Sequence, residues 1–253
     1  MAFLLSTYGD LLRELLEKGF RFGPISAYFE AASPPFIFLR HDVDRISSRA
    51  VHMAAAERDL GIKATYYFRC DSHMLFPEED IRFVVDLGHE IGFRYETVAR
   101  LEWRTDEVLD RFCQELAALR ALADVRTVTA HGPPLSQLPT VRFAKKLDLG
   151  KLGIVGDPAV DIDFSKVLYI TETGGVFGSR ANRRDWSGGK NLRDPTPPSV
   201  LGKTLDPGQE PFVVLSTHPE RWPLAVVGLV QARLSDLFVN LFMAFAGGGL
   251  GRE

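Results

Sequence analysis

Two closely spaced aspartates are the residues of this sequence best suited to chemistry. They lie in His41-Asp42-Val43-Asp44, directly after a short apolar run of the kind that forms a buried strand. If the strand continues, its alternation places Asp42 and Asp44 on one face. Two neighbouring carboxylates do not both stay ionised at low cost unless a cation or a proton lies between them. The pair therefore predicts a positive group here, most simply a divalent metal.

Three more polar clusters follow predicted strands. They are Gly88 to Glu96, which carries Arg94 and Glu96 on one face; His131-Gly132-Pro133-Pro134; and Ser216 to Trp222, which contains His218 and Arg221. In parallel α/β proteins the reactive groups gather at the carboxyl ends of the strands. We therefore expect the four clusters to line one cleft.

Structural roles for the same residues remain open. Asp42 and Asp44 could serve as the N-terminal cap of the helix that follows them. Trp222 either forms a wall on which a sugar stacks or packs in the core. His131 either binds a ligand or is an ordinary hydrogen-bonding group of a loop. His218 is the stronger candidate, because an apolar strand precedes it and a proline follows it.

Strands and helices alternate along the chain and must position these clusters. Apolar spacing predicts helices near 7–18, 46–60, 78–87 and 105–122, and strands near 36–39, 63–69, 89–95, 125–130, 152–155, 167–171 and 212–217. This alternation predicts a mostly parallel sheet, open or closed. Residues 174–210 are rich in Gly, Pro, Asn, Asp and Arg, which indicates a long irregular excursion.

The length of 253 residues predicts one domain spanning 1–253. Within it, residues 1–30 are expected to be a helical lead-in and residues 223–245 a C-terminal helix. The polar residues of that last segment argue against a membrane span. The amino terminus has no basic region of the kind that begins a secretory signal, so we expect a cytoplasmic protein.

The charge balance argues against nucleic acid as a partner. Thirty basic and thirty-three acidic residues give a net charge of -3, and no window holds the dense Lys/Arg stripe that phosphate backbones require. The chain also lacks Gly-x-Ser-x-Gly, and neither Cys70 nor Cys113 has a neighbouring histidine. A serine or cysteine hydrolase is therefore set aside.

Taken in order, the motifs resemble those of the polysaccharide deacetylases of carbohydrate esterase family 4. The likeness rests on the Asp-x-Asp strand end, Gly-His-Glu-Ile-Gly, a Pro-Pro loop and a last strand ending in His, over about residues 36–222. The phrases His-Asp-Val-Asp, Ala-His-Gly-Pro-Pro-Leu-Ser and Thr-His-Pro-Glu-Arg-Trp look closer to a divergent branch. The resemblance implies an α/β fold, a distorted (β/α)7 barrel of the polysaccharide deacetylase type.

The resemblance also implies a reaction. It is the removal of an acetyl or other acyl group from an N-acylated sugar or related amide by metal-activated water. By position, the family's catalytic base falls on Asp42, its metal-binding aspartate on Asp44 and its general acid on His218. Residues expected to contact the carbohydrate or small amide substrate are His41, Arg94, Pro134, Arg221 and Trp222.

The pattern departs from the family at its two histidine metal ligands, which fall on Arg94 and Val98. Neither residue can hold zinc, since a guanidinium has no lone pair to offer and valine has no donor atom. A rebuilt site for zinc or a similar divalent metal would comprise Asp44, Glu96 and His131, with or without Asp42. Alternatively, Arg94 takes the place of the metal. The chain is then a metal-free, catalytically impaired relative that binds a glycan or nucleotide-sugar.

Overall fold

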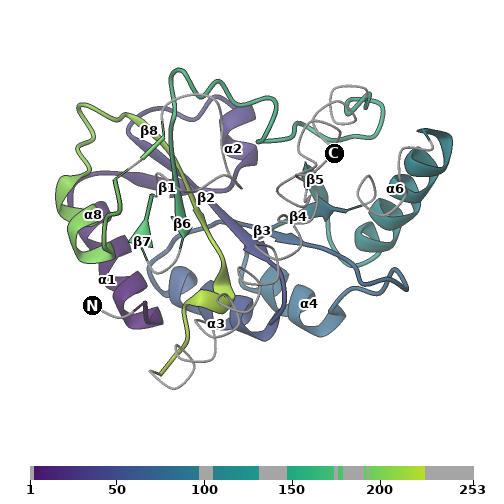
Figure 1. Cartoon of the computed structure of the whole chain (residues 1–253), viewed down its shortest axis with the longest axis horizontal. Coiled ribbons are helices and arrows are strands. Elements are labelled where there is room, and N and C mark those ends of the chain that lie inside the picture. Colours follow the sequence, from purple (N-terminus) through teal and green to yellow (C-terminus); the bar gives the residue numbers. More distant parts are fainter. Residues whose placement is uncertain are drawn as a thin grey trace, which may run out of the picture.

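The computed structural model describes residues 3–96, 105–130, 147–173, 176–178, 191–192 and 194–225 (Figure 1). In chain order the elements are α1 (Leu5–Glu17), β1 (Arg21–Gly23), α2 (Ser26–Phe29), β2 (Phe36–Val43), α3 (Ser48–Asp59), β3 (Thr65–Phe68), α4 (Glu78–Asp86), β4 (Glu90–Tyr95), α6 (Thr105–Arg120), β5 (Val125–Ala130), β6 (Leu168–Thr173), β7 (Val176–Phe177), α8 (Pro198–Thr204), β8 (Phe212–Thr217) and the 3-10 helix η1 (Pro219–Arg221). Over these ranges, no helix has both the length and the apolar character needed to cross a bilayer.

An eight-stranded sheet forms the centre of the molecule and confirms the predicted α/β class. Its order is β5-β4-β3-β2-β8-β6-β7, with β1 paired to the start of β2. All described pairings are parallel except that of β6 with β7. In the described part of the chain the end strands β5 and β7 are not bonded to each other, so the barrel-like sheet is open there.

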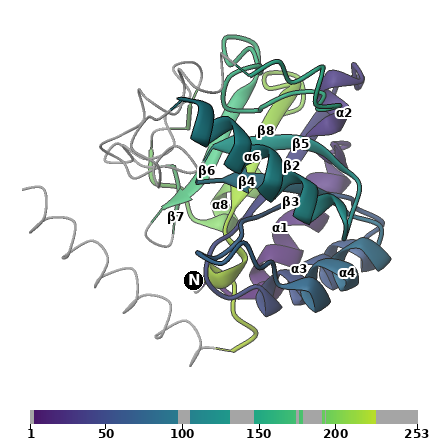
Figure 2. The same cartoon turned by 90° about the vertical axis from the view of Figure 1, so that its right-hand side faces the viewer.

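The two faces of the sheet bury different sets of side chains. Ile37 and Leu39 of β2 belong to the large core beneath α1, α3 and α4, which lie together on one side of the sheet in Figures 1 and 2. Phe38 belongs to a second, smaller cluster on the opposite face. Central parallel strands are covered on both faces, which is why β2 begins as an unbroken apolar run. Arg40 and Asp42 continue the face of Phe38 toward the carboxyl end.

Most of the predicted elements are confirmed to within a few residues. Strand β2 is longer than predicted, because it runs to Val43 and so includes the first aspartate of the polar cluster. The predicted strand at 152–155 is wrong: the chain turns there, and only Gly156 makes a single β-bridge, with Thr127. The stretch 174–210 is less irregular than predicted, since it holds β7 and α8.

The two ends of the chain give a mixed outcome. The expected helical lead-in contains α1 and α2, but also β1, which extends the sheet. The expected C-terminal helix falls largely on residues 226–245, outside the described residues, and 223–225 are not helical. The single domain from 1 to 253 stays a prediction.

Gly92 of β4 makes room for an aromatic ring beneath the site. A Cβ atom at this position would lie 2.3 Å from Cε1 of Tyr67, so only glycine allows the ring to cross the strand. The Tyr67 hydroxyl donates to Thr127 at 3.0 Å, which fixes the ring. The guanidinium carbon of Arg40 lies 5.2 Å from the ring centroid. The second glycine of Gly-His-Glu-Ile-Gly thus supports an arginine of the site.

Candidate functional site

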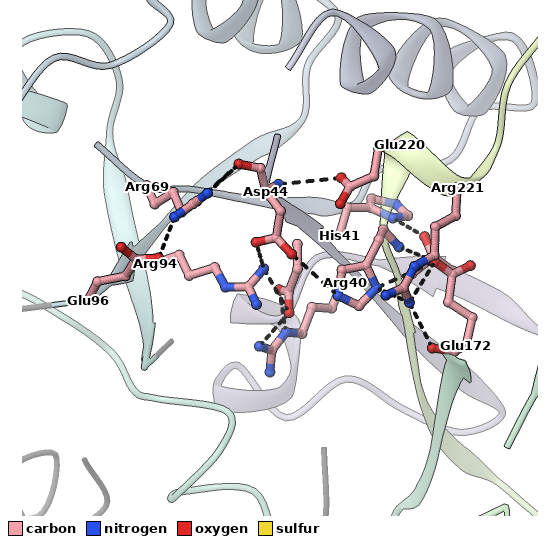
Figure 3. Close-up of polar contacts among 12 residues, drawn as sticks. Arg40, His41, Asp44, Arg69, Arg94, Glu96, Glu172, Glu220 and Arg221 are labelled. Carbon is pink, nitrogen blue, oxygen red and sulfur yellow. Dashed lines mark hydrogen bonds and ion pairs between the residues drawn. The ribbon is translucent and has the colours of Figure 1, made fainter. Parts of the chain in front are cut away.

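Polar side chains meet at the carboxyl ends of the neighbouring strands β4, β3, β2 and β8 (Figure 3). Asp42 belongs to β2 and Asp44 follows it, Arg94 belongs to β4, and His218 follows β8. Asp42 and Asp44 face the same way, as strand alternation predicts, because Arg94 contacts both carboxylates. The structure therefore brings together three of the four predicted clusters, and the fourth lies outside the described residues.

Four side chains of alternating charge form the centre of the site. Arg40 donates two hydrogen bonds to Asp42, from Nε to Oδ1 at 2.9 Å and from Nη2 to Oδ2 at 3.0 Å. Arg94 Nη1 lies 3.3 Å from Asp42 Oδ2 and 2.7 Å from Asp44 Oδ1. We call these four residues the Arg–Asp chain. The guanidinium of Arg94 lies between the carboxylates of Asp42 and Asp44, where the sequence predicts a positive group.

Electrostatics make Asp42 a weak base. Burial alone would raise the pKa of its carboxyl, but Arg40 and then Arg94 outweigh burial and hold the pKa well below its usual range. Burial would lower the pKa of Arg40, yet Asp42 outweighs it and the pKa is raised. A general base works best when its pKa lies near the working pH. Asp42 is instead a permanently ionised partner of two arginines.

Arg69 holds the side of the site next to Asp44. Its Nε and Nη2 donate to the main-chain oxygen of Asp44 at 3.0 Å and 2.8 Å, and its Nη1 donates to Glu96 Oε1 at 2.5 Å. One planar guanidinium thus joins the chain after β2 to the residue after β4. The Glu96 carboxylate is therefore paired with Arg69.

His218 faces Asp44 from β8 and is oriented by Glu172 of β6. Its main-chain N–H donates to Glu172 Oε1 at 2.7 Å, and its ring Nδ1 lies 3.4 Å from the same oxygen. Ring Nε2 lies 3.9 Å from Asp44 Oδ2. Burial and Arg221 would lower the pKa of His218, but the hydrogen bond to Glu172 and the charge of Asp44 outweigh them and raise it. The ring therefore keeps a proton to higher pH than an ordinary histidine.

Glu220 adds a further buried carboxyl to the site. Its Oε2 lies 3.5 Å from the main-chain nitrogen of Asp44, and its main-chain oxygen accepts a hydrogen bond from Arg49 of α3. Burial raises its pKa, Asp44 raises it further, and His218 opposes the shift without cancelling it. The carboxyl therefore keeps a proton to higher pH than an ordinary glutamate.

Four residues of this site were missed by the sequence analysis. They are Arg40, Arg69, Glu172 and Glu220. Arg40 immediately precedes the first polar cluster, and Glu220 lies inside the last one. Arg69 and Glu172 lie within one residue of the ends of predicted strands. A search for every charged residue at a strand end, rather than for family motifs, would have found all four.

His41, which the sequence predicts as a substrate contact, lies on the face of β2 turned away from Asp42. Its neighbours Arg40 and Asp42 point to the face that carries the site. Strand alternation therefore points the His41 ring to the other face, toward α3. Its side chain is 0% exposed; Nε2 lies 2.7 Å from Glu57 Oε1 and Nδ1 lies 2.7 Å from Thr217 Oγ1. Its role is to tie β2 to α3 and β8.

Trp222, also predicted as a substrate contact, lies in the hydrophobic core. The residue is 2% exposed, its ring lies 4.2 Å from that of Phe3, and its indole N–H donates to Glu172 at 2.5 Å. Of the two readings of this tryptophan, core packing is the one the structure bears out. Its neighbour Arg221 lies at the site, where it donates to the main-chain oxygen of Glu172 at 3.1 Å.

The described residues do not fit a divalent metal. No group of three or more His, Cys, Asp or Glu side chains among them is arranged to hold an ion. Arg94 already bridges Asp42 and Asp44, and arginine does not lose its proton in proteins. A metal on Asp44 would have to displace this guanidinium. Two further predicted residues, His131 as a ligand and Pro134 as a substrate contact, lie outside the described residues.

Asp157 is a separate buried carboxyl that interacts electrostatically with Arg40. It is 1% exposed, its Oδ1 accepts from the main chain of Ala159 at 2.9 Å, and its Oδ2 accepts from the Tyr95 hydroxyl at 3.3 Å. Burial raises its pKa to about 7, Asp161 adds to the rise, and the hydrogen bonds and Arg40 oppose it. Asp157 therefore changes charge near neutral pH.

The comparisons with known proteins show a distant likeness in architecture. No protein-family model and no curated protein matches the chain. Similar solved structures include a wild-type CE4 family pseudoenzyme from Bacillus anthracis, at 12% identity, and two mutants at 12% and 13%, the first described as having restored enzymatic activity. Each match has a TM-score of 0.42 and covers 81% of this chain. The chain spans only 60–62% of the length of those structures.

Replacing Arg94 should destabilise the protein, because the carboxylates of Asp42 and Asp44 then repel each other. In Arg94→Met two buried carboxylates lose their shared cation, so we expect a loss of about 3–5 kcal/mol in the free energy of unfolding at pH 7, measured by urea denaturation. Arg94→Lys keeps the charge but not the planar fork, and should lie between this variant and wild type.

The matched control for this measurement is Arg82→Met, which removes an exposed ion pair with Glu78 on α4. Its cost should stay below about 1 kcal/mol. An Arg94→Met protein as stable as the control would contradict the bridging role of Arg94.

Asp157 should make the stability of the protein fall as pH rises. Its pKa is raised in the folded state, so the folded protein binds this proton more tightly than the unfolded chain, and the stability gained below pH 4 is lost as pH rises through about 7. Asp157→Asn should therefore gain stability relative to wild type between pH 4 and 8, measured by urea unfolding.

The exposed Asp163, whose pKa is lowered to about 2, provides the control: Asp163→Asn should show no such gain. Parallel pH profiles for Asp157→Asn and wild type would refute the prediction.

Proposed function

We propose that the chain binds a neutral, hydroxyl-rich ligand of the carbohydrate class in a metal-free cleft, and does not hydrolyse it. The observation that carries the proposal is the guanidinium of Arg94 between Asp42 and Asp44, at 3.3 Å and 2.7 Å. A fixed positive charge stabilises the two carboxylates as a metal ion would. It cannot accept a lone pair from water, so it supplies no Lewis acid.

The state of Asp42 supports binding without hydrolysis. Its carboxylate accepts two hydrogen bonds from Arg40 and contacts Arg94, so its pKa is held well below the usual range. Proton removal from water by such a carboxylate is strongly uphill. Asp42 is also 2% exposed, whereas the Asp44 side chain keeps 16% of its surface exposed. Of the two aspartates, Asp44 therefore has the more accessible side chain in the free protein.

The mixture of donors and acceptors at the cleft supports a carbohydrate ligand. Arg69, Arg221 and the ring of His218 offer N–H donors, while Asp44 and Glu220 offer oxygen acceptors. A sugar hydroxyl both donates and accepts, so it matches such a surface. The described arginines of the site each contact a carboxylate. This balance of charges favours a neutral sugar over a phosphorylated one.

A metal-dependent deacetylase is the competing function. It is favoured by the retained Asp42 and Asp44 and by His218, whose raised pKa suits a general acid. It requires Arg94 to leave the two carboxylates so that a divalent ion can bind. The two functions therefore differ in whether the purified protein takes up a metal.

The deciding experiment combines metal content with sugar binding and acetate release. Wild type and Arg94→His/Val98→His, which restores the two histidines of the resembled family, are dialysed against zinc and analysed by mass spectrometry. Binding of N-acetylglucosamine, its tetramer and UDP-N-acetylglucosamine is followed by calorimetry. We expect wild type to retain no stoichiometric zinc, to bind a neutral sugar and to release no acetate. The double variant should gain zinc.

Two outcomes would contradict the proposal. Stoichiometric zinc in wild type together with acetate release would establish the deacetylase. Failure of wild type to bind any of the three sugars would remove the carbohydrate class as ligand, even if Arg94 excludes the metal.

A further inference from the structure

Thr129 of β5 carries a buried hydroxyl that the fold does not use. The residue is 0% exposed, and its Oγ1 makes no hydrogen bond within the described part of the chain. A buried hydroxyl without a partner costs stability, because it has lost its bonds to water and gained none in return. Such a group calls for an explanation, and one explanation is a partner that arrives only with the ligand.

The register of the sheet places this hydroxyl at the Arg–Asp chain. Thr129 is the direct partner of Arg94 in the parallel pairing of β4 with β5. Paired residues of neighbouring strands point to the same face and lie about 4.8 Å apart. Because the Arg94 side chain points at Asp42 and Asp44, the Thr129 side chain points to the same face of the sheet as these two aspartates.

Thr127, two residues earlier on β5, lies on the same face of the sheet. We call this face, which also carries Phe38 and Arg40 of β2, the inner face. Its hydroxyl accepts from Tyr67 at 3.0 Å and donates to Glu90 Oε1 at 3.0 Å. The two threonines are thus alike in type, strand, face and burial. They differ in that one is satisfied by the fold and the other is not.

We propose that Thr129 contacts the ligand at the Arg–Asp chain, where its hydroxyl exchanges a hydrogen bond with a hydroxyl of the bound sugar next to Arg94. This assignment rests on the proposed function. The free protein keeps an unsatisfied group, and the ligand satisfies it on binding. An analogue without this sugar hydroxyl would leave the Thr129 hydroxyl unpaired in the complex. The site would therefore bind the analogue more weakly than the sugar.

The proposal predicts opposite effects for two matched substitutions. Thr129→Val keeps the shape and removes an unsatisfied hydroxyl, so the urea midpoint of the free protein should stay equal or rise. Its affinity for the best-bound of N-acetylglucosamine, its tetramer and UDP-N-acetylglucosamine should fall about tenfold, the equivalent of one hydrogen bond. Thr127→Val removes a satisfied hydroxyl, so its urea midpoint should fall while its sugar affinity stays within about twofold of wild type.

The outcomes separate this assignment from the function on which it rests. A Thr129→Val protein that binds the sugar as wild type does overturns the assignment and leaves sugar binding intact. A fall in its urea midpoint also overturns it, because the hydroxyl then has a structural role. Wild type that binds none of the three sugars overturns both.

Discussion

Two carboxylates on one face of a strand need a positive charge between them, and most of this site follows from how that need is met. Asp42 and Asp44 are two residues apart, and Arg94 bridges them from β4. A guanidinium brings the charge permanently, with the planar geometry that carboxylates match. It also lies between the two carboxylates that a divalent ion would need as ligands. Under the proposed function, the stability of the site and its lack of metal chemistry therefore have one cause.

The surroundings hold this arrangement in place from both sides of the sheet. On the inner face, Gly92 admits the Tyr67 ring, which supports Arg40 against Asp42. On the outer face, His41 anchors β2 to Glu57 of α3. Buried ion pairs are stable only when their remaining hydrogen bonds are satisfied. This requirement explains why many polar contacts surround the carboxyl end of β2.

The sequence predicted the scaffold well and the centre of the site in part. Alternating apolar runs located the long helices and the parallel strands, because burial on two faces leaves a pattern that is local in sequence. The period of two predicted that Asp42 and Asp44 share a face, yet the same rule was not applied to His41, which it turns away. Glu172 and Arg69 could not be assigned from motifs, because their importance comes from strand order, which joins residues distant in the chain. Trp222 kept two readings until its neighbours in space were known.

The most direct test of the account is a crystal structure of the wild-type protein grown with excess zinc, with anomalous diffraction data collected above the zinc absorption edge. The account predicts the Arg94 guanidinium within hydrogen-bond distance of both Asp42 and Asp44, and no anomalous peak at these carboxylates. A zinc peak bound to Asp44, with Arg94 turned away from it, would contradict the account.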